Sequence, residues 1–147
     1  MSAVEVSIAI DAPPEAVWEV VTDPQRLEEW VTIHRALKKS DGGELDEGYS
    51  MKQALCLRGV KFEVTWKAAE VDHLRLLRWE GRGPARSRAT TEYRLDARDG
   101  GTHFDYRNEF KAPLGPLGKV ASKALVGGVP EREANASLQR LKALVES

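Results

Sequence analysis

The feature that most constrains this chain is its central region, residues 32–112, where turn sequences recur and no helical periodicity intervenes. Most of the turns combine glycine with proline or a polar residue, and they stand at Asp41-Gly42-Gly43, Glu47-Gly48, Arg58-Gly59, Asp72-His73, Gly81-Arg82-Gly83-Pro84 and Asp99-Gly100-Gly101. Such residues favour tight hairpins between strands. Because parallel strands would need helical crossovers, the region predicts an antiparallel meander.

Three predicted strands, residues 61–68, 88–96 and 102–111, alternate with a period of two, which gives the sheet one charged face and one apolar face. The apolar face carries Phe62, Val64, Trp66, Thr91, Tyr93, Tyr106, Asn108 and Phe110, and an earlier strand adds Met51, Gln53 and Leu55. Other elements must cover an aromatic face of this kind.

Before the meander, residues 4–10 alternate as a half-buried strand, and two short helices are predicted to follow it. Asp11 is expected to cap the first helix, which has a proline pair in its first turn. A further proline ends that helix. Asp23 is then expected to cap the second helix, which ends at Trp30.

After the meander, residues 114–146 show helical spacing of apolar residues. At about 1.5 Å per residue, a continuous helix here would span roughly 50 Å. A glycine pair before Pro130 predicts a kink at residues 127–130. This helix is predicted to cover the apolar face of the sheet.

Length and charge limit the protein class. A chain of 147 residues is expected to form a single domain, 1–147. The 22 basic and 23 acidic residues give a net charge of -1, which does not suggest a nucleic-acid partner. The lone Cys56 and the N-terminal sequence predict a cytoplasmic protein, and no apolar run is long enough for a membrane span.

Recognisable catalytic and metal-binding motifs are missing from the sequence. We therefore expect no catalytic residue, no metal and no cofactor. His73 and His103 are predicted to be solvated, whereas His34 lies just past Trp30, near the expected mouth of a cavity. Cys56 is out of phase with its apolar neighbours and is expected to be structural.

A run of arginines raises the question of a nucleic-acid patch. Because acidic residues share their face and the facing strand, cross-strand ion pairing is the favoured interpretation. The arginines concerned are Arg82, Arg86, Arg88, Arg94 and Arg98.

The order of elements resembles the helix-grip fold, which includes START-related lipid-transfer domains, Bet v 1-like proteins and the bacterial polyketide cyclase/dehydrase family. The resemblance rests on "APPEAVWEVVTDP" followed by "LEEW", on the hairpin "TTEYRLDARDGGTHFDYRNEF" and on "SLQRLKALVE". Together these matches span the chain. They imply an α+β fold in which a curved antiparallel sheet of about seven strands wraps around a long C-terminal helix, with two short helices after the first strand.

The same resemblance implies an internal cavity for an apolar or amphipathic ligand. Gln53, Thr91 and Asn108 lie on the inward face and either anchor that ligand or bond to neighbouring backbone and water. The predicted cavity residues are Met51, Gln53, Leu55, Phe62, Val64, Trp66, Thr91, Tyr93, Tyr106, Asn108, Ala121, Ala124, Leu125 and Gly128, with Trp30 and His34 at the mouth.

The predicted function is to carry or sense a hydrophobic or amphipathic small molecule such as a lipid, isoprenoid or polyketide, as a monomer or homodimer. One alternative is a cyclase/dehydratase in which Tyr93, Tyr106 and Asn108 polarise a carbonyl, although the pattern places no inward acid or histidine to act as base. Another is a protein-interaction module like the chaperone activators, which would need an exposed apolar patch. Trp79 is the aromatic residue that the alternation does not place inside or outside.

Overall fold

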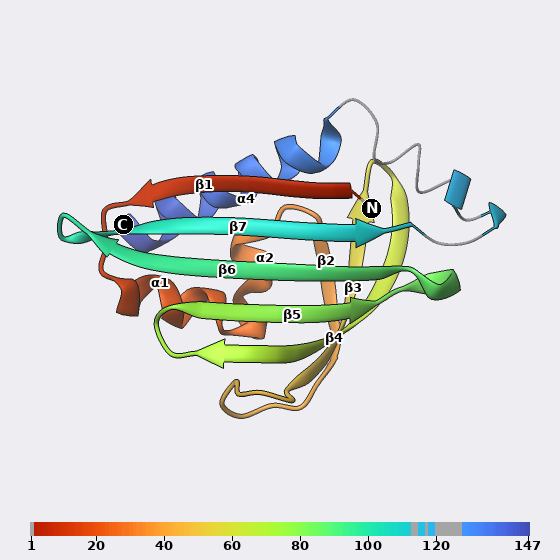
Figure 1. The fold of residues 1–147 in the computed structure, drawn as a ribbon, viewed down its shortest axis with the longest axis horizontal. Helices are drawn as coiled ribbons and strands as arrows, with labels where there is room; N and C mark the ends of the chain where they lie inside the picture. Colours follow the sequence, from red (N-terminus) through yellow and green to blue (C-terminus); the bar gives the residue numbers. More distant parts are fainter. Residues whose placement is uncertain (1, 113–114, 117, 120–127) are drawn as a thin grey trace.

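The computed structural model describes residues 2–112, 115–116, 118–119 and 128–147 (Figure 1). Its sheet consists of seven antiparallel strands in the order β1-β7-β6-β5-β4-β3-β2. The strands are β1 (Ser2–Ile10), β2 (His34–Ser40), β3 (Ser50–Leu57), β4 (Val60–Asp72), β5 (Leu76–Arg82), β6 (Arg88–Arg98) and β7 (Gly101–Lys111). The helices are α1 (Pro14–Val21), α2 (Leu27–Trp30) and α4 (Val129–Glu146), with short 3-10 turns η1 (Pro24–Arg26) and η2 (Pro84–Arg86). The predicted helix-grip architecture is confirmed.

Two hairpins show why the chain folds back where it does. β3 turns into β4 through Arg58 and Gly59, with φ angles of 50° and 79°. β6 turns into β7 through Asp99 and Gly100, with φ angles of 50° and 80°. Two successive positive φ angles match the twist of the flanking strands, and glycine adopts them without a steric cost.

The strand alternation is confirmed. In β4, the buried side chains of Val64, Trp66 and Ala68 alternate with the exposed Thr65 and Lys67. The same period holds in β6, where the buried Thr91, Tyr93 and Leu95 alternate with less buried neighbours. Figure 1 shows the three helices on one side of the sheet, with β2 and β3 curling back towards them, and α4 packs mainly against β1.

The two short helices differ in how they begin. Asp23 caps the second helical stretch as predicted, because its Oδ1 accepts a hydrogen bond of 3.0 Å from the backbone N–H of Gln25. The prediction for Asp11 was wrong: α1 begins at Pro14, and its N-cap is Pro13, which offers no side-chain acceptor. The backbone N–H of Asp11 instead donates to Glu146 at the end of α4, at 2.7 Å.

The C-terminal helix also differs from the expected single kinked rod. Gly128 has φ 71° and ψ 18°, a left-handed conformation that cannot continue a right-handed helix. Consequently α4 starts at Val129, and its 18 residues extend about 27 Å. Most of the predicted helix before Gly128 lies outside the described residues. In the part of the chain that the structure describes, no helix is long and apolar enough to cross a membrane.

Candidate functional site

A cavity of about 240 Å³ lies between the sheet and the helices α2 and α4. It occupies one half of the molecule, near the β3–β4 turn, the β5–β6 connection and the start of α4. Its wall is mainly apolar and includes Leu27, Met51, Leu55, Phe62, Val64, Trp66, Trp79, Tyr93, Phe110, Ala134 and Leu138. Ile10, Val17, Phe104 and Leu141 fill the other half of the core and do not line the cavity.

Most of the predicted inward residues share this cavity. Met51, Gln53, Leu55, Phe62, Val64, Trp66, Thr91, Tyr93, Tyr106 and Asn108 all line it. Ala121, Ala124 and Leu125 lie outside the described residues. Gly128 is exposed and does not line the cavity, so the expectation that it makes room for a ligand was wrong; its left-handed conformation serves the start of α4.

Trp30 lies at the inner end of the cavity, not at the mouth where it was expected. Its side chain is 1% exposed, and its ring packs edge-on against Tyr93 and Phe104, with centroids 5.6 Å and 6.5 Å away. Among the described residues, its indole Nε1 has no hydrogen-bond partner. Since Tyr93 lines the cavity and Phe104 does not, Trp30 forms a partition between the hollow and filled halves of the core.

Gln53 connects the cavity wall to a histidine. Its Oε1 accepts a hydrogen bond of 2.9 Å from the Trp66 indole, and its Nε2 lies 2.8 Å from His34 Nδ1. Because the amide nitrogen is a donor, His34 must accept through Nδ1 and hold its proton on Nε2. Partial burial lowers the pKa of His34, with Glu28 opposing the shift. His34 itself does not line the cavity, so its effect there passes through Gln53.

A second polar group lies on β6 and β7. Asn108 Nδ2 donates to Tyr106 Oη at 3.1 Å and to Thr91 Oγ1 at 3.3 Å. Burial raises the pKa of Tyr106, although hydrogen bonds with Asn108 and Thr91 oppose the shift. Burial also raises the pKa of Tyr93, so both phenols remain neutral donors at physiological pH. No described residue donates a hydrogen bond to the side-chain oxygen of Asn108, Oδ1.

Strand alternation did not identify the third polar group, because none of its residues lies on a strand. Thr32, Glu133 and Ser137 line the cavity where the α2–β2 connection meets α4. The Thr32 hydroxyl donates to the Glu133 carboxylate, and the Thr32 N–H donates to Ser137 Oγ at 3.0 Å. The helical periodicity predicted that Ala134 and Leu138 face inward. The neighbouring positions 133 and 137 lie beside that face, and this is the sequence feature that could have indicated Glu133 and Ser137.

The arginines on the outer face are paired differently from the prediction. Arg94 pairs with Glu92 at 3.0 Å and Arg98 with Asp96 at 2.8 Å, so both pairs run along β6 and not across strands. Arg82, Arg86 and Arg88 form no ion pair with any described residue. The predicted cross-strand pairing of this cluster was therefore wrong.

The remaining histidines lie outside the cavity. His73 is exposed, with its ring edge-on to Trp18 at 5.9 Å, and His103 Nε2 lies 3.0 Å from Asp105 Oδ1 on the outer face. The described residues contain no group of three or more His, Cys, Asp or Glu side chains that could hold a metal ion.

Comparisons with known proteins agree with this architecture. A Mycobacterium tuberculosis protein, Rv1546, is 27% identical over 131 residues, which cover 88% of this chain and 92% of that protein. The crystal structure of TTHA0849 from Thermus thermophilus superposes with a TM-score of 0.79 at 18% identity, covering 98% of this chain and 97% of that one. Ara h 8.0201 gives a TM-score of 0.64 at 15% identity, with 98% and 97% coverage.

The family comparison covers nearly the whole chain. Residues 1–146 match the model described as polyketide cyclase / dehydrase and lipid transport. The chain belongs to this family.

Proposed function

We propose that the protein binds a hydrophobic or amphipathic small molecule in the cavity. The observation that carries the proposal is the mainly apolar wall, in which polar side chains are already held in place by one another. Such sites typically combine apolar surface with a few fixed polar groups. An apolar cavity of about 150 Å³ is large enough for benzene in a protein core, so about 240 Å³ has room for a longer or fused ligand.

The three polar groups differ in the hydrogen bonds that they can still form with a ligand. The side-chain oxygen of Gln53 accepts from Trp66, whereas the side-chain oxygen of Asn108 has no donor among the described residues. A ligand hydroxyl could therefore donate to Asn108. The Tyr106 hydroxyl is a neutral donor for a ligand carbonyl. These two residues are the proposed anchors that fix the ligand's orientation.

The test uses a substitution on β6 that places a larger side chain in the cavity. Ala89 lines the cavity, whereas Ala97 on the same strand is exposed at the other end of the sheet. Ala89→Leu should keep the fold and weaken binding of apolar ligands at least tenfold in native mass spectrometry or fluorescence titration, because the added methyl groups occupy ligand space. Ala97→Leu is the matched control and should bind as the parent does. Equal binding by both variants would contradict the proposed site.

Glu133 favours a second candidate function, a cyclase-type reaction in the same cavity. Its carboxylate would take a proton from a carbon between two carbonyls, and that carbon would form a C–C bond to a third carbonyl carbon, whose oxygen would take up the proton to become a hydroxyl. Loss of this hydroxyl together with the second proton of the attacking carbon would release water and form a C=C bond. The Tyr106 hydroxyl would donate a hydrogen bond to the developing oxyanion, and Asn108 would hold that hydroxyl in place. The cavity position of Glu133 supplies the inward base that the sequence pattern lacked.

This second function is tested with a linear poly-β-keto thioester, by following the loss of water in mass spectrometry. Glu133→Gln should keep ligand affinity and reduce turnover by about 10² or more. Glu131→Gln is the control, because Glu131 is exposed on the same helix. No turnover by the parent protein would leave binding as the supported function and remove the catalytic one.

The protein-interaction alternative receives less support. Trp79 is 4% exposed and packs edge-on against Tyr49, at 6.2 Å between ring centroids. It lines the cavity and so does not supply the exposed apolar patch that this alternative required.

A further inference from the structure

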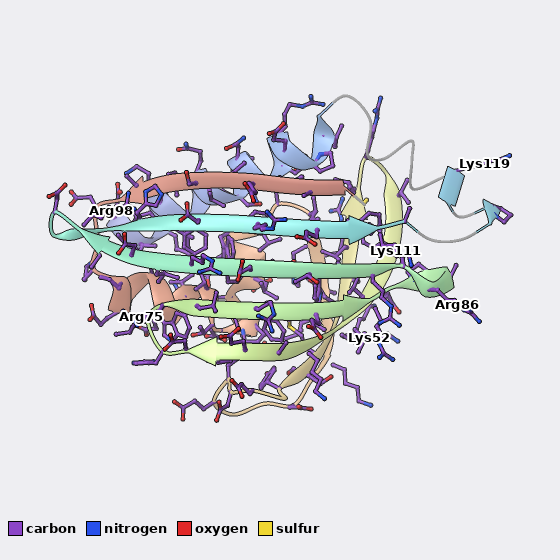
Figure 2. All side chains as sticks on the ribbon, viewed as in Figure 1. Lys52, Arg75, Arg86, Arg98, Lys111 and Lys119 are labelled. Carbon is purple, nitrogen blue, oxygen red and sulfur yellow. The ribbon has the colours of Figure 1, made fainter. Side chains whose placement is uncertain are left out.

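Five cations gather at the end of the sheet where the cavity lies, and we call them the basic end: Lys61, Arg82, Arg86, Arg88 and Lys111. Across the sheet, Arg82 is the register partner of Arg88, and Arg88 is the partner of Lys111. Neighbouring strands lie about 4.8 Å apart, so three like charges stand in a row. Figure 2 places Arg86 and Lys111 at this end, and Arg75 and Arg98 at the opposite end.

The basic end lacks the counter-ions found elsewhere on the same face. Arg78 pairs with Glu70 at 2.6 Å, and Arg94 and Arg98 pair with neighbouring acids. None of the five cations of the basic end forms an ion pair with a described residue. The nearby acids Glu63 and Glu109 instead pair with Lys52 and Arg107. Since like charges directly opposite one another are destabilising, an unneutralised row in a chain of net charge -1 needs an explanation.

Two residues of the basic end reach the cavity. Lys61 and Arg88 both line it, whereas Arg82, Arg86 and Lys111 do not. Going inward along β6 from Arg88, Thr91 follows after about 10 Å and Tyr93 after about 17 Å, at roughly 3.3 Å per residue. Tyr93 contacts Trp30, which closes the inner end. The space therefore has a cationic end, a polar group part of the way in, and an apolar inner end.

From this arrangement we infer that the ligand is an anionic amphiphile, with a carboxylate or phosphate between Lys61 and Arg88 and an apolar chain that extends inward to Trp30. The inference rests on the proposed function and specifies its ligand class. An anion held by Arg88 and Lys61 would reduce the repulsion that Arg88 exerts on Arg82 and Lys111, and it would accept charge-assisted hydrogen bonds from the guanidinium and ammonium groups. A neutral lipid would leave the row unneutralised.

The experiment compares three probes of equal chain length: decanoic acid, methyl decanoate and decanol. Binding to the full chain is measured by calorimetry or by displacement of a fluorescent apolar probe. Decanoate should bind at least tenfold more tightly than the ester or the alcohol at low salt. Raising the ionic strength from about 0.01 M to 0.1 M should narrow this difference, because the Debye length falls from about 30 Å to 10 Å.

The variant Lys61→Gln/Arg88→Gln should lose the preference for the acid while keeping its affinity for decanol. Arg75→Gln removes one cation far from the cavity and is the control for position, because Arg75 is exposed at the opposite end and forms no ion pair with a described residue. If decyl phosphate binds as tightly as decanoate, the recognised feature is the negative charge and not the carboxyl group itself. That result would still support the inference.

The two proposals fail in different ways. Failure of all the probes to bind would contradict the proposed function. Equal binding of acid, ester and alcohol would overturn the inferred ligand charge and leave the cavity as a site for neutral ligands. Equal loss of acid binding in Arg75→Gln and Lys61→Gln/Arg88→Gln would show a general charge effect, and it too would overturn the inference.

Discussion

The two halves of the core share one sheet and the same alternation, yet one is filled and the other is hollow. In the filled half, Phe104, Leu141 and the α1 residue Val17 are all 0% exposed and belong to the hydrophobic core. In the hollow half, Phe62 and Tyr106 are only partly buried, and both line the cavity. Strand pattern sets which face is inward; what covers that face decides whether the interior is filled.

The inward polar residues differ between the halves in the same way. Thr102, in the filled half, is 2% exposed and donates to the Ala12 carbonyl at 2.7 Å, which satisfies a backbone acceptor. Thr91, in the hollow half, accepts a longer 3.3 Å hydrogen bond from Asn108, whose side-chain oxygen has no donor among the described residues. Polar groups in the filled half complete the fold, whereas those in the hollow half retain capacity for another molecule.

The largest expected contrast comes from deleting one phenylalanine ring in each half. Phe104→Ala should lower the free energy of unfolding by about 3–5 kcal/mol, because it leaves a void among packed neighbours. Phe62→Ala should cost less, about 1–2 kcal/mol, because one side of this ring already borders the cavity and has fewer contacts to lose. Urea denaturation followed by circular dichroism measures both values.

Equal losses for the two variants would mean that the hollow half is as tightly packed as the filled one. Phe62→Leu serves as a milder control, because it keeps an apolar side chain and should cost less than Phe62→Ala. A larger loss in the free energy of unfolding for Phe62→Ala than for Phe104→Ala would contradict the division of the core into a filled and a hollow half.

A smaller contrast is expected from removing one hydroxyl group in each half. Thr102→Val should destabilise the protein by about 1–2 kcal/mol, because the buried Ala12 carbonyl loses its donor. Thr91→Val should change stability by less than about 0.5 kcal/mol, since Asn108 Nδ2 keeps its hydrogen bond to Tyr106. Thermal unfolding at a fixed protein concentration compares the two β-branched replacements. A large loss in Thr91→Val alone would identify Thr91 as a structural residue.

The fold could be predicted from the sequence because its signals are local. The period of two in β4 and the paired positive φ angles at Asp99 and Gly100 each depend on a few neighbouring residues. The end of α1 and the cap by Asp23 were likewise encoded nearby. Asp11 was the exception, because α1 begins at Pro14 and Pro13, not Asp11, occupies the cap position.

The site was only partly predictable, because its shape depends on which elements meet in space. Strand phase identified Gln53 and Asn108 as inward. It could not show that Trp30 separates two halves, nor that Trp79 is buried against Tyr49. Glu133 was missed because its contact with Thr32 joins residues about a hundred positions apart in the sequence.

The smallest expected effect comes from His34, whose side chain hydrogen-bonds to the cavity-wall residue Gln53. Burial lowers its pKa from the ordinary value of 6.5, so the unfolded chain binds a proton at a higher pH than the folded one. Stability should then be unaffected by His34 above about pH 6.5, fall as the pH drops through that value, and level off below the folded pKa. Protonation also removes the acceptor at Nδ1 on which the Gln53 amide depends.

His34→Gln removes this titration and supplies the comparison. The parent protein should lose stability relative to His34→Gln between about pH 7 and pH 5, with the sign fixed by the greater proton uptake of the unfolded state. If Gln53 carries the effect to the wall, tryptophan fluorescence should change over the same pH range in the parent and not in Trp66→Phe. A parallel pH dependence of stability in the parent and His34→Gln would show that His34 does not contribute. A fluorescence change that persists in Trp66→Phe would place the response outside the Gln53–Trp66 contact, because that contact requires the indole N–H as donor.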